Sequence, residues 1–256
     1  MIDMVDQTAD YAERIDAAAK TQIQRFRKMA KGVHPRTCPI CKYHGSFTAY
    51  GQPPRLDARC AKCNSLERHR LFHLYAEKKD LFKAKHAVLH FAPEVQITPY
   101  VEARVAVYET ADLSDRRKTT HKINIEKTEL ADAVYDRIIC SHVLEHVDDA
   151  KALSEMFRML KPGGIALLAT PVVEGWARTY ENAAVEKNTD RFVHFGQSDH
   201  VRLYGRDVRE RIRSAGFQLG EVTATEPDVL TYGLMRGETL FIATKPAGQP
   251  PATEGT

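Results

Sequence analysis

Four of the five cysteines in this 256-residue chain occur as two Cys-x-x-Cys pairs. The pairs are Cys38-Pro-Ile-Cys41 and Cys60-Ala-Lys-Cys63, and 18 residues separate them. Two such pairs can present four thiolates in the tetrahedral arrangement that Zn²⁺ takes in closed sites. Two disulfides are the weaker explanation for a chain expected in the cytoplasm, where thiols are kept reduced. The spacing therefore predicts one structural zinc ion, with no position open for a catalytic water.

A second group of reactive side chains lies in the segment 194–204. His200 is the candidate general base, because histidine titrates near neutral pH and Asp199 adjoins it in sequence. Arg202 is suited to holding an anionic group, and Tyr204 to forming an apolar wall. The alternative is that Asp199 caps a helix and Arg202 pairs with it. Asp199 and His200 need not form a dyad, because neighbours on an extended segment face opposite sides.

The elements around the cysteines are expected to be mostly irregular. Apolar positions at helical spacing predict a helix over residues 1–31, which Gly32 and Pro35 would end. Residues 33–65 are rich in Cys, Pro and Gly and predict loops held by something other than an apolar core. A second helix is expected over residues 65–85.

From His86 onward, short apolar runs alternate with helical stretches. This alternation predicts an α/β domain in which helices cover a parallel sheet on both faces. Strands are expected at residues 87–91, 105–108, 137–140, 165–169 and 240–243, with helices at 149–160 and 206–215. The predicted parts are an N-terminal helix (1–32), a four-cysteine zinc-ribbon module with a connecting helix (33–85), the sheet domain (86–245) and a disordered tail (246–256).

The segment 136–171 contains His-Val-Leu-Glu-His after one expected strand and Leu-Lys-Pro-Gly-Gly before the next. It resembles the class I S-adenosylmethionine (SAM)-dependent methyltransferases, in particular their methyltransferase type 11-like branch. The resemblance extends from about Ala87 to Lys245, and residues 60–70 are similar to a zinc knuckle that precedes some of these domains. It implies SAM as cofactor and a Rossmann-like, seven-stranded, mostly parallel sheet.

The resemblance also implies which residues bind the cofactor. Asp112 would accept the ribose hydroxyls, with Glu109 as the alternative, and Asn124 would receive the adenine amino group. The positions implied are His90, Phe91, Ala92, Glu94, Asp112, Asn124, Ser141 and His142.

The first turn of the sheet domain departs from the usual family pattern. Most members have a glycine-rich turn there, whereas this chain has Ala92 followed by Pro93, which predicts a rigid loop. Glu145 and His146 are interpreted as ordinary helix-start residues, because an acidic group is favoured at that end of a helix.

Composition favours a small-molecule acceptor, such as a sugar, a lipid precursor or a specialised metabolite. The net charge of +3 is too mild to indicate nucleic-acid binding, although residues 55–70 are locally basic. The alternatives are an RNA methyltransferase that binds RNA through the zinc module and, less favoured, a non-catalytic adaptor. No apolar run of about 18 residues or secretory signal is visible, so a cytoplasmic protein is expected. The acceptor atom and the oligomeric state stay open.

Overall fold

The computed structural model describes residues 17–18, 20–22, 31–51, 54–114 and 118–248. The chain forms two compact units. The first contains the residues up to Leu71 together with Ala224–Arg236, and the second contains Phe72–Thr223 and the residues from Gly237 onward. The first unit thus recruits a segment from near the C-terminus, a pairing for which the sequence carries no visible signal.

The first unit is built on an antiparallel sheet of three strands in the order β1-β2-β3. The strands are β1 (Lys31–Thr37), β2 (His44–Tyr50) and β3 (Arg55–Arg59), and helix α2 (Glu67–Lys78) follows. The expectation of loops over residues 33–65 is therefore wrong. Glycine and proline within short, irregularly paired strands hide the alternation that marks a strand. The predicted helix over 1–31 falls mostly outside the described residues, of which 17–18 and 20–22 are helical, and most of the predicted disordered tail lies outside them too.

Two arginines attach the segment 224–236, which contains α7 (Asp228–Tyr232), to this small sheet. The buried guanidinium of Arg70 donates to the carbonyls of Tyr232 and Gly233, and it lies 4.7 Å from the centre of the Phe47 ring. Arg36 donates to the Leu230 carbonyl at 2.5 Å. Because a guanidinium offers five donors in a fixed plane, each arginine joins segments that are distant in sequence.

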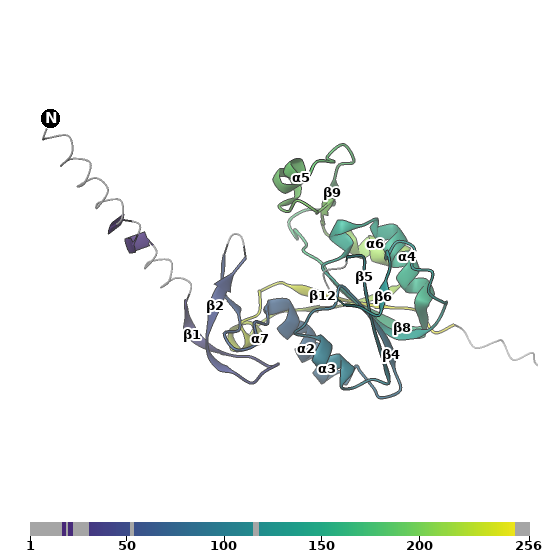
Figure 1. Cartoon of the computed structure of the whole chain (residues 1–256), viewed down its shortest axis with the longest axis horizontal. Coiled ribbons are helices and arrows are strands. Elements are labelled where there is room, and N and C mark those ends of the chain that lie inside the picture. The colour runs from purple at the N-terminus through teal and green to yellow at the C-terminus, as the bar shows by residue number, and fades with distance from the viewer. Residues whose placement is uncertain (1–16, 19, 23–30, 52–53, 115–117, 249–256) are drawn as a thin grey trace, which may run out of the picture. The chain divides into compact units, whose positions relative to one another are not determined.

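The second unit contains a seven-stranded sheet in the order β11-β12-β8-β7-β4-β5-β6 (Figure 1). Only β12 runs antiparallel to its neighbours, which confirms the predicted seven-stranded, mostly parallel α/β fold. The strands are β4 (Ala87–Phe91), β5 (Val107–Asp112), β6 (His121–Lys122), β7 (Tyr135–Ser141), β8 (Leu160–Ala169), β11 (Gln218–Thr223) and β12 (Thr239–Thr244).

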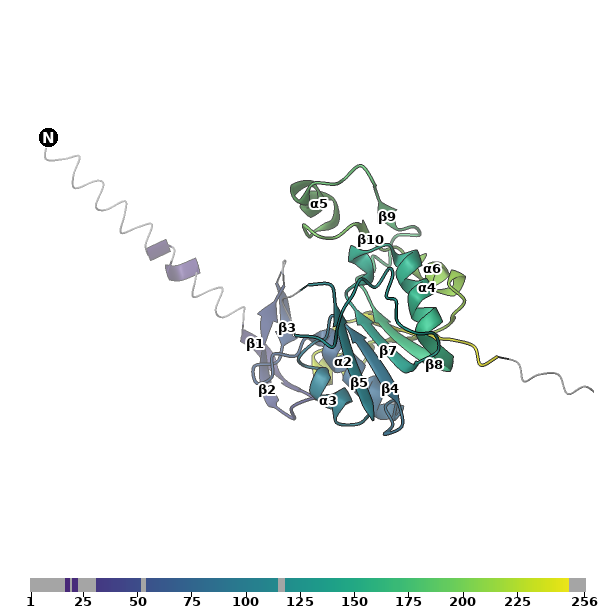
Figure 2. The same ribbon diagram turned by 45° about the vertical axis from the view of Figure 1, so that its right-hand side comes forward.

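Helices cover the sheet on both faces, with α4 (Asp149–Met159) and α6 (Val208–Ser214) on one side and α3 (Thr98–Glu102) on the other (Figures 1 and 2). The buried side chains of α4 recur at helical spacing and include Leu153 and Met156. They pack into one core with Ile138, Leu168 and Phe241 from the central strands. This core fixes the strand ends from which the site is built.

An insertion between β8 and α6 carries β9 (Tyr180–Glu181), α5 (Asn188–Phe195) and β10 (Arg202–Leu203). Strands β9 and β10 pair antiparallel at its base, and α5 extends away from the sheet (Figure 2). Among the described residues, no helix is both long and apolar enough to cross a bilayer.

Candidate active site and cysteine cluster

A cavity of about 540 Å³ opens at the carboxyl ends of the parallel strands. The chain passes from β4 to β5 and β6 on one side, then returns to β7 on the other side of β4. Ligands of open α/β sheets bind at such a reversal, because the loops that follow the two strands diverge there. The lining residues are Phe91, Ala92, Ala111, Asp112, Leu113, Ser114, Ile123, Asn124, Ile125, His142, Val143, His146, Val147 and Asp199.

The turn after β4 forms without a glycine. Ala92 has a φ of 47°, in the left-handed region that glycine usually occupies, and its N–H donates to the Ala111 carbonyl at 2.8 Å. His142, at the end of β7, also has a positive φ, of 54°. The small methyl group of Ala92 leaves the backbone of this turn accessible from the cavity, which is what a closely bound cofactor requires.

Asp112 and Asn124 both line the cavity. The Asp112 carboxylate ends β5 and accepts hydrogen bonds from the backbone N–H and the hydroxyl of Ser114, at 2.8 and 3.1 Å. Asn124 Oδ1 accepts from the Glu126 N–H at 3.0 Å and has a second lone pair. Glu109 is not at the cavity, and its carboxylate instead contacts His121 and Tyr135. Of the two candidate acids for the ribose hydroxyls, Asp112 lines the cavity and Glu109 does not.

Five of the eight implied cofactor positions line the cavity, and three do not. His90 is fully buried within β4, and its Nδ1 lies 2.8 Å from the Tyr108 hydroxyl. The Glu94 carbonyl accepts the N–H groups that begin α3, and Ser141 pairs with Ala169 inside the sheet. These three residues support the surrounding strands and turns rather than face the cavity.

Glu145, His146 and His200 form a group that we call the histidine cluster. One ligand atom from each lies within 4.8 Å of the others, and the rings of His146 and His200 meet edge to face at 4.6 Å. The buried Glu145 carboxylate contacts His142 Nδ1 at 3.1 Å and accepts from the Thr170 hydroxyl at 2.9 Å. Glu145 lies in the first turn of the short helix Leu144–His146, as its interpretation as a helix-start residue expects, and it is also buried among histidines.

The charges of the histidine cluster favour an ionised glutamate and a neutral His200. Burial raises the pKa of Glu145, but the hydrogen bond and charge of His142 outweigh it and hold that pKa below its usual value. Burial lowers the pKa of His200, and the charge of His146 lowers it further. The Phe195 backbone raises the pKa of His200 and so partly opposes this lowering. Among the described residues, Nδ1 of His200 has no hydrogen-bond partner of ordinary geometry.

His200 does not line the cavity, whereas Asp199 and His146 do. The Asp199 carbonyl lies 3.1 Å from His146 Nδ1, and its exposed carboxylate lies 3.5 Å from the same nitrogen. Asp199 thus contacts His146 directly and acts on His200 through its charge. The sequence did carry one signal for Glu145 and His146. In the pattern His-Val-Leu-Glu-His, the acid follows His142 by three positions and directly precedes His146.

Arg202 and Tyr204 are buried and do not line the cavity. Arg202 pairs with Glu181 at 3.0 Å and donates to the carbonyls of Leu144 and Val147. The Tyr204 hydroxyl donates to the Asp149 carboxylate at 2.8 Å. The expectation that Arg202 binds an anionic substrate is corrected, because carboxylates and carbonyls of the chain itself already occupy its donors.

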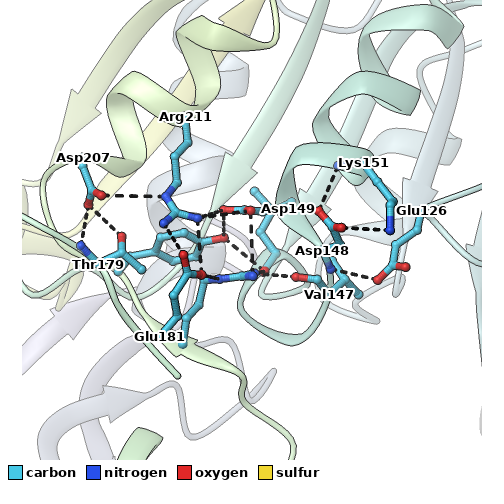
Figure 3. Close-up of polar contacts among 12 residues, drawn as sticks. Glu126, Val147, Asp148, Asp149, Lys151, Thr179, Glu181, Asp207 and Arg211 are labelled. Carbon is cyan, nitrogen blue, oxygen red and sulfur yellow. Dashed lines mark hydrogen bonds and ion pairs between the residues drawn. The ribbon is translucent and has the colours of Figure 1, made fainter. Parts of the chain in front are cut away.

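The same network joins the insertion to the start of α4. Arg211 contacts Asp149 at 3.1 Å and Glu181 at 2.7 Å, so two arginines share two carboxylates (Figure 3). The Val201 N–H also donates to the Glu145 carbonyl at 3.0 Å. These contacts hold His200 against the short helical turn η1 (Leu144–His146), although the two segments are distant in sequence.

Residues 83–168 match the family model described as "Methyltransferase domain". The match covers 86 of the 256 residues of the chain. A probable S-adenosylmethionine-dependent methyltransferase of Mycolicibacterium smegmatis is 43% identical over 49 residues, which are 19% of this chain and 19% of that protein. The match thus spans about a fifth of the curated relative's length.

Solved structures are also similar to this chain. The YcgJ protein of Bacillus subtilis is 14% identical, with a TM-score of 0.49, and the alignment covers 70% of this chain and 100% of that one. The 1,6-didemethyltoxoflavin-N1-methyltransferase of Burkholderia thailandensis is 16% identical, with a TM-score of 0.46, over 68% and 76% of the two chains. That enzyme was solved with 1,6-didemethyltoxoflavin and S-adenosylhomocysteine bound.

Outside residues 83–168, Cys38, Cys41, Cys60 and Cys63 form the cysteine cluster, whose four sulfur atoms lie within 4.8 Å of one another. The Cys38–Cys63 and Cys41–Cys60 sulfur distances are 3.6 and 3.7 Å. Both are far longer than a disulfide bond of about 2.05 Å. They match the edge of about 3.8 Å that a regular tetrahedron has when each Zn–S bond is about 2.3 Å.

The two Cys-x-x-Cys turns have the same backbone geometry. The carbonyls of Cys38 and Cys60 accept the N–H groups of Lys42 and Asn64, and these two residues share a φ of 58°. Burial raises the pKa of Cys38, but the Ser65 hydroxyl and nearby backbone amides outweigh it and lower that pKa to about 7. Burial and the neighbouring thiols raise the pKa of Cys41 to about 12. The cluster thus offers four sulfur atoms that one cation could contact.

Proposed function

We propose that this protein is a SAM-dependent methyltransferase that acts on a small-molecule acceptor, such as a sugar, a lipid precursor or a specialised metabolite. The observation that carries the proposal is the cavity at the strand reversal of a methyltransferase domain, with an acidic side chain at the end of β5. Its volume of about 540 Å³ falls in the range of small-ligand sites.

In this proposal, Asp112 accepts hydrogen bonds from the ribose hydroxyls, and the free lone pair of Asn124 Oδ1 accepts the adenine amino group. The side chains of Ile123 and Ile125 provide apolar surface for the adenine ring. When bound, SAM supplies a methyl group on a positively charged sulfur. The protein then has to align the acceptor with that methyl group and manage the acceptor's proton.

The acceptor end of the cavity is proposed to lie beside His146 and Asp199. His200, neutral and in ring contact with His146, is the proposed proton acceptor. Replacing His200 with alanine should lower turnover by about 10²- to 10⁴-fold, the usual range for a lost acid–base group. SAM affinity should stay nearly unchanged. Wild-type turnover in this variant would remove His200 from the mechanism.

The cysteine cluster is proposed to hold one structural Zn²⁺ through its four sulfurs, which would leave no coordination position open. Free thiols at these distances also fit a reducing compartment, which supports a cytoplasmic location. Elemental analysis of the purified protein should give one zinc per chain. A stoichiometry well below one after purification without chelators would contradict the zinc assignment.

Two measurements test the methyltransferase assignment. Calorimetry with SAM should detect one binding site, and labelled SAM incubated with a metabolite extract should label a small molecule. Absence of SAM binding at millimolar cofactor would instead support a non-catalytic adaptor. Labelling of RNA, with binding that weakens steeply as salt rises, would support an RNA methyltransferase.

The local charge pattern disfavours the RNA alternative. Arg55 is paired with Glu67 at 2.8 Å, and the guanidinium of Arg70 is buried against backbone carbonyls. Part of the basic stretch at residues 55–70 is therefore used inside the first unit and is not available to phosphate groups.

A further inference from the structure

We propose that the histidine cluster binds one divalent transition-metal ion, such as Mn²⁺, Fe²⁺ or Zn²⁺, at the acceptor end of the cavity. The three side chains offer two imidazole nitrogens and one carboxylate oxygen within 4.8 Å of one another. Two histidines and one carboxylate form a set that such ions accept, and it leaves coordination positions free for other ligands. The site is separate from the cysteine cluster in both sequence and ligand chemistry.

The hydrogen bonds around the cluster orient its members as metal ligands are usually oriented. His146 Nδ1 contacts the Asp199 carbonyl at 3.1 Å. A carbonyl only accepts, so Nδ1 carries the proton and Nε2 keeps the lone pair that a cation needs. A histidine that ligates a metal commonly donates its other N–H to a carbonyl in this way.

Glu145 and His200 supply the independent observations. The Glu145 carboxylate is held on both oxygens, by His142 and by the Thr170 hydroxyl, so its position is fixed before any ion arrives. His200 is 5% exposed, and its Nδ1 has no hydrogen-bond partner of ordinary geometry among the described residues. A buried imidazole without such a partner is costly, and a bound cation would organise the ring.

The position of the cluster indicates what the ion would do, and this part rests on the proposed function. Of the three ligands, His146 lines the cavity, so an ion held by the cluster would lie next to the space assigned to the acceptor. An acceptor with one or two neighbouring oxygens would bind there. The cation would lower the pKa of a bound hydroxyl, whose O–H bond then breaks with its electron pair staying on oxygen and its proton passing to water.

With the ion bound, His200 is a ligand and water takes the place of His200 as the proton acceptor, because a lone pair that binds a cation cannot take a proton. The full-length protein with its cysteine cluster loaded with zinc is titrated with Mn²⁺, and free Mn²⁺ is followed by electron paramagnetic resonance. We expect one bound Mn²⁺ per chain. H146A and H200A should each weaken binding by about 10- to 100-fold or more, and the double variant should abolish it.

Two further variants keep this test decisive. E145Q retains the shape of a buried side chain and removes its charge, and H146Q changes a partly exposed residue in case the buried substitutions unfold. Both should weaken Mn²⁺ binding by at least about 10-fold. The matched control is H194A, which removes an exposed histidine of the same insertion that contacts Tyr180, and it should leave Mn²⁺ affinity unchanged.

Two results would overturn the metal site. One is that no Mn²⁺ binds at about 1 mM, because a weaker affinity would be too low to matter. The other is that the H146A/H200A double variant binds Mn²⁺ as tightly as the wild type. SAM calorimetry on the same samples separates the two proposals. A protein that binds SAM but no Mn²⁺ refutes the metal site alone. A protein that binds Mn²⁺ at the histidine cluster but no SAM supports the metal site and contradicts the methyltransferase assignment.

Discussion

The cysteine cluster and the histidine cluster place ligand atoms at similar distances but by opposite means. In the first, two short turns of nearly identical backbone supply two sulfurs each, and few other contacts are needed. In the second, Glu145 and His146 come from one loop and His200 from another, and a buried network brings them together. A local motif thus positions one group, and tertiary structure positions the other.

The largest expected effect is that loss of zinc unfolds the region of the cysteine cluster and leaves the region of the histidine cluster folded. C60S, or a strong chelator, should abolish zinc binding and unfold the β1–β3 sheet, because structural zinc sites contribute roughly 10 kcal/mol or more to folding. Hydrogen exchange should show lost protection over residues 31–71 and retained protection in β4, β7 and β8. C140A removes a cysteine outside the cluster and should keep one zinc per chain. Full protection of residues 31–71 in the zinc-free protein would contradict this difference.

The network under the histidine cluster should show the next largest effect. R202A removes a buried cation from Glu181 and from the backbone carbonyls of the Leu144–Val147 turn, and should lower the free energy of unfolding by about 3 kcal/mol. The control R178A breaks an exposed pair with Glu210 and should change that free energy by less than about 0.5 kcal/mol. Urea unfolding measures both. Equal losses of unfolding free energy in R202A and R178A would contradict a stabilising role of this network for the insertion.

At the cavity, D112N should weaken SAM binding by about 10- to 100-fold, because it removes the negative charge from a hydrogen-bond acceptor. Calorimetry measures the affinity. E109Q is the matched control: Glu109 contacts His121 and Tyr135 away from the cavity, so the SAM dissociation constant should stay within about twofold of wild type, well below a 1.4 kcal/mol step. A larger loss in E109Q than in D112N would reverse the two assignments.

The smallest effect is expected at Ala92. A92G removes the strain of a non-glycine residue at a left-handed φ, but it also gives the unfolded chain more conformational freedom. These two effects nearly cancel, so the free energy of unfolding should change by less than about 1 kcal/mol. A92V, which places a branched side chain at the same φ, should be clearly less stable and bind SAM more weakly. Thermal unfolding compares the two variants. A stable A92V would show that this turn tolerates bulk.

The sequence predicts the elements of the sheet domain well, because their signals are local. The expected strand at residues 87–91 coincides with β4, and the cysteine pairs meet as their spacing indicates. Asp112 reaches the cavity because it ends a strand, and the ends of parallel strands share one edge.

The failures come from partners that are distant along the chain. Arg202 has the composition of a substrate-binding residue, but Glu181 lies 21 positions away and pairs with it. His146 and Asp199 are 53 positions apart, so their contact is invisible in a local pattern. Side-chain type indicates what chemistry is available, whereas burial and partners decide whether a substrate can use it.

The attachment of residues 224–236 to the first unit determines when that unit can finish folding during synthesis. Arg70 donates to the Tyr232 carbonyl, 162 positions later in the chain. At a synthesis rate of about 5–20 residues per second, this partner follows Arg70 by roughly 8–30 s. The cysteine-bearing sheet therefore leaves the ribosome early and is completed only after β4 to β11 have emerged. During that interval the guanidinium of Arg70 lacks two of the backbone carbonyls that accept its hydrogen bonds in the folded protein.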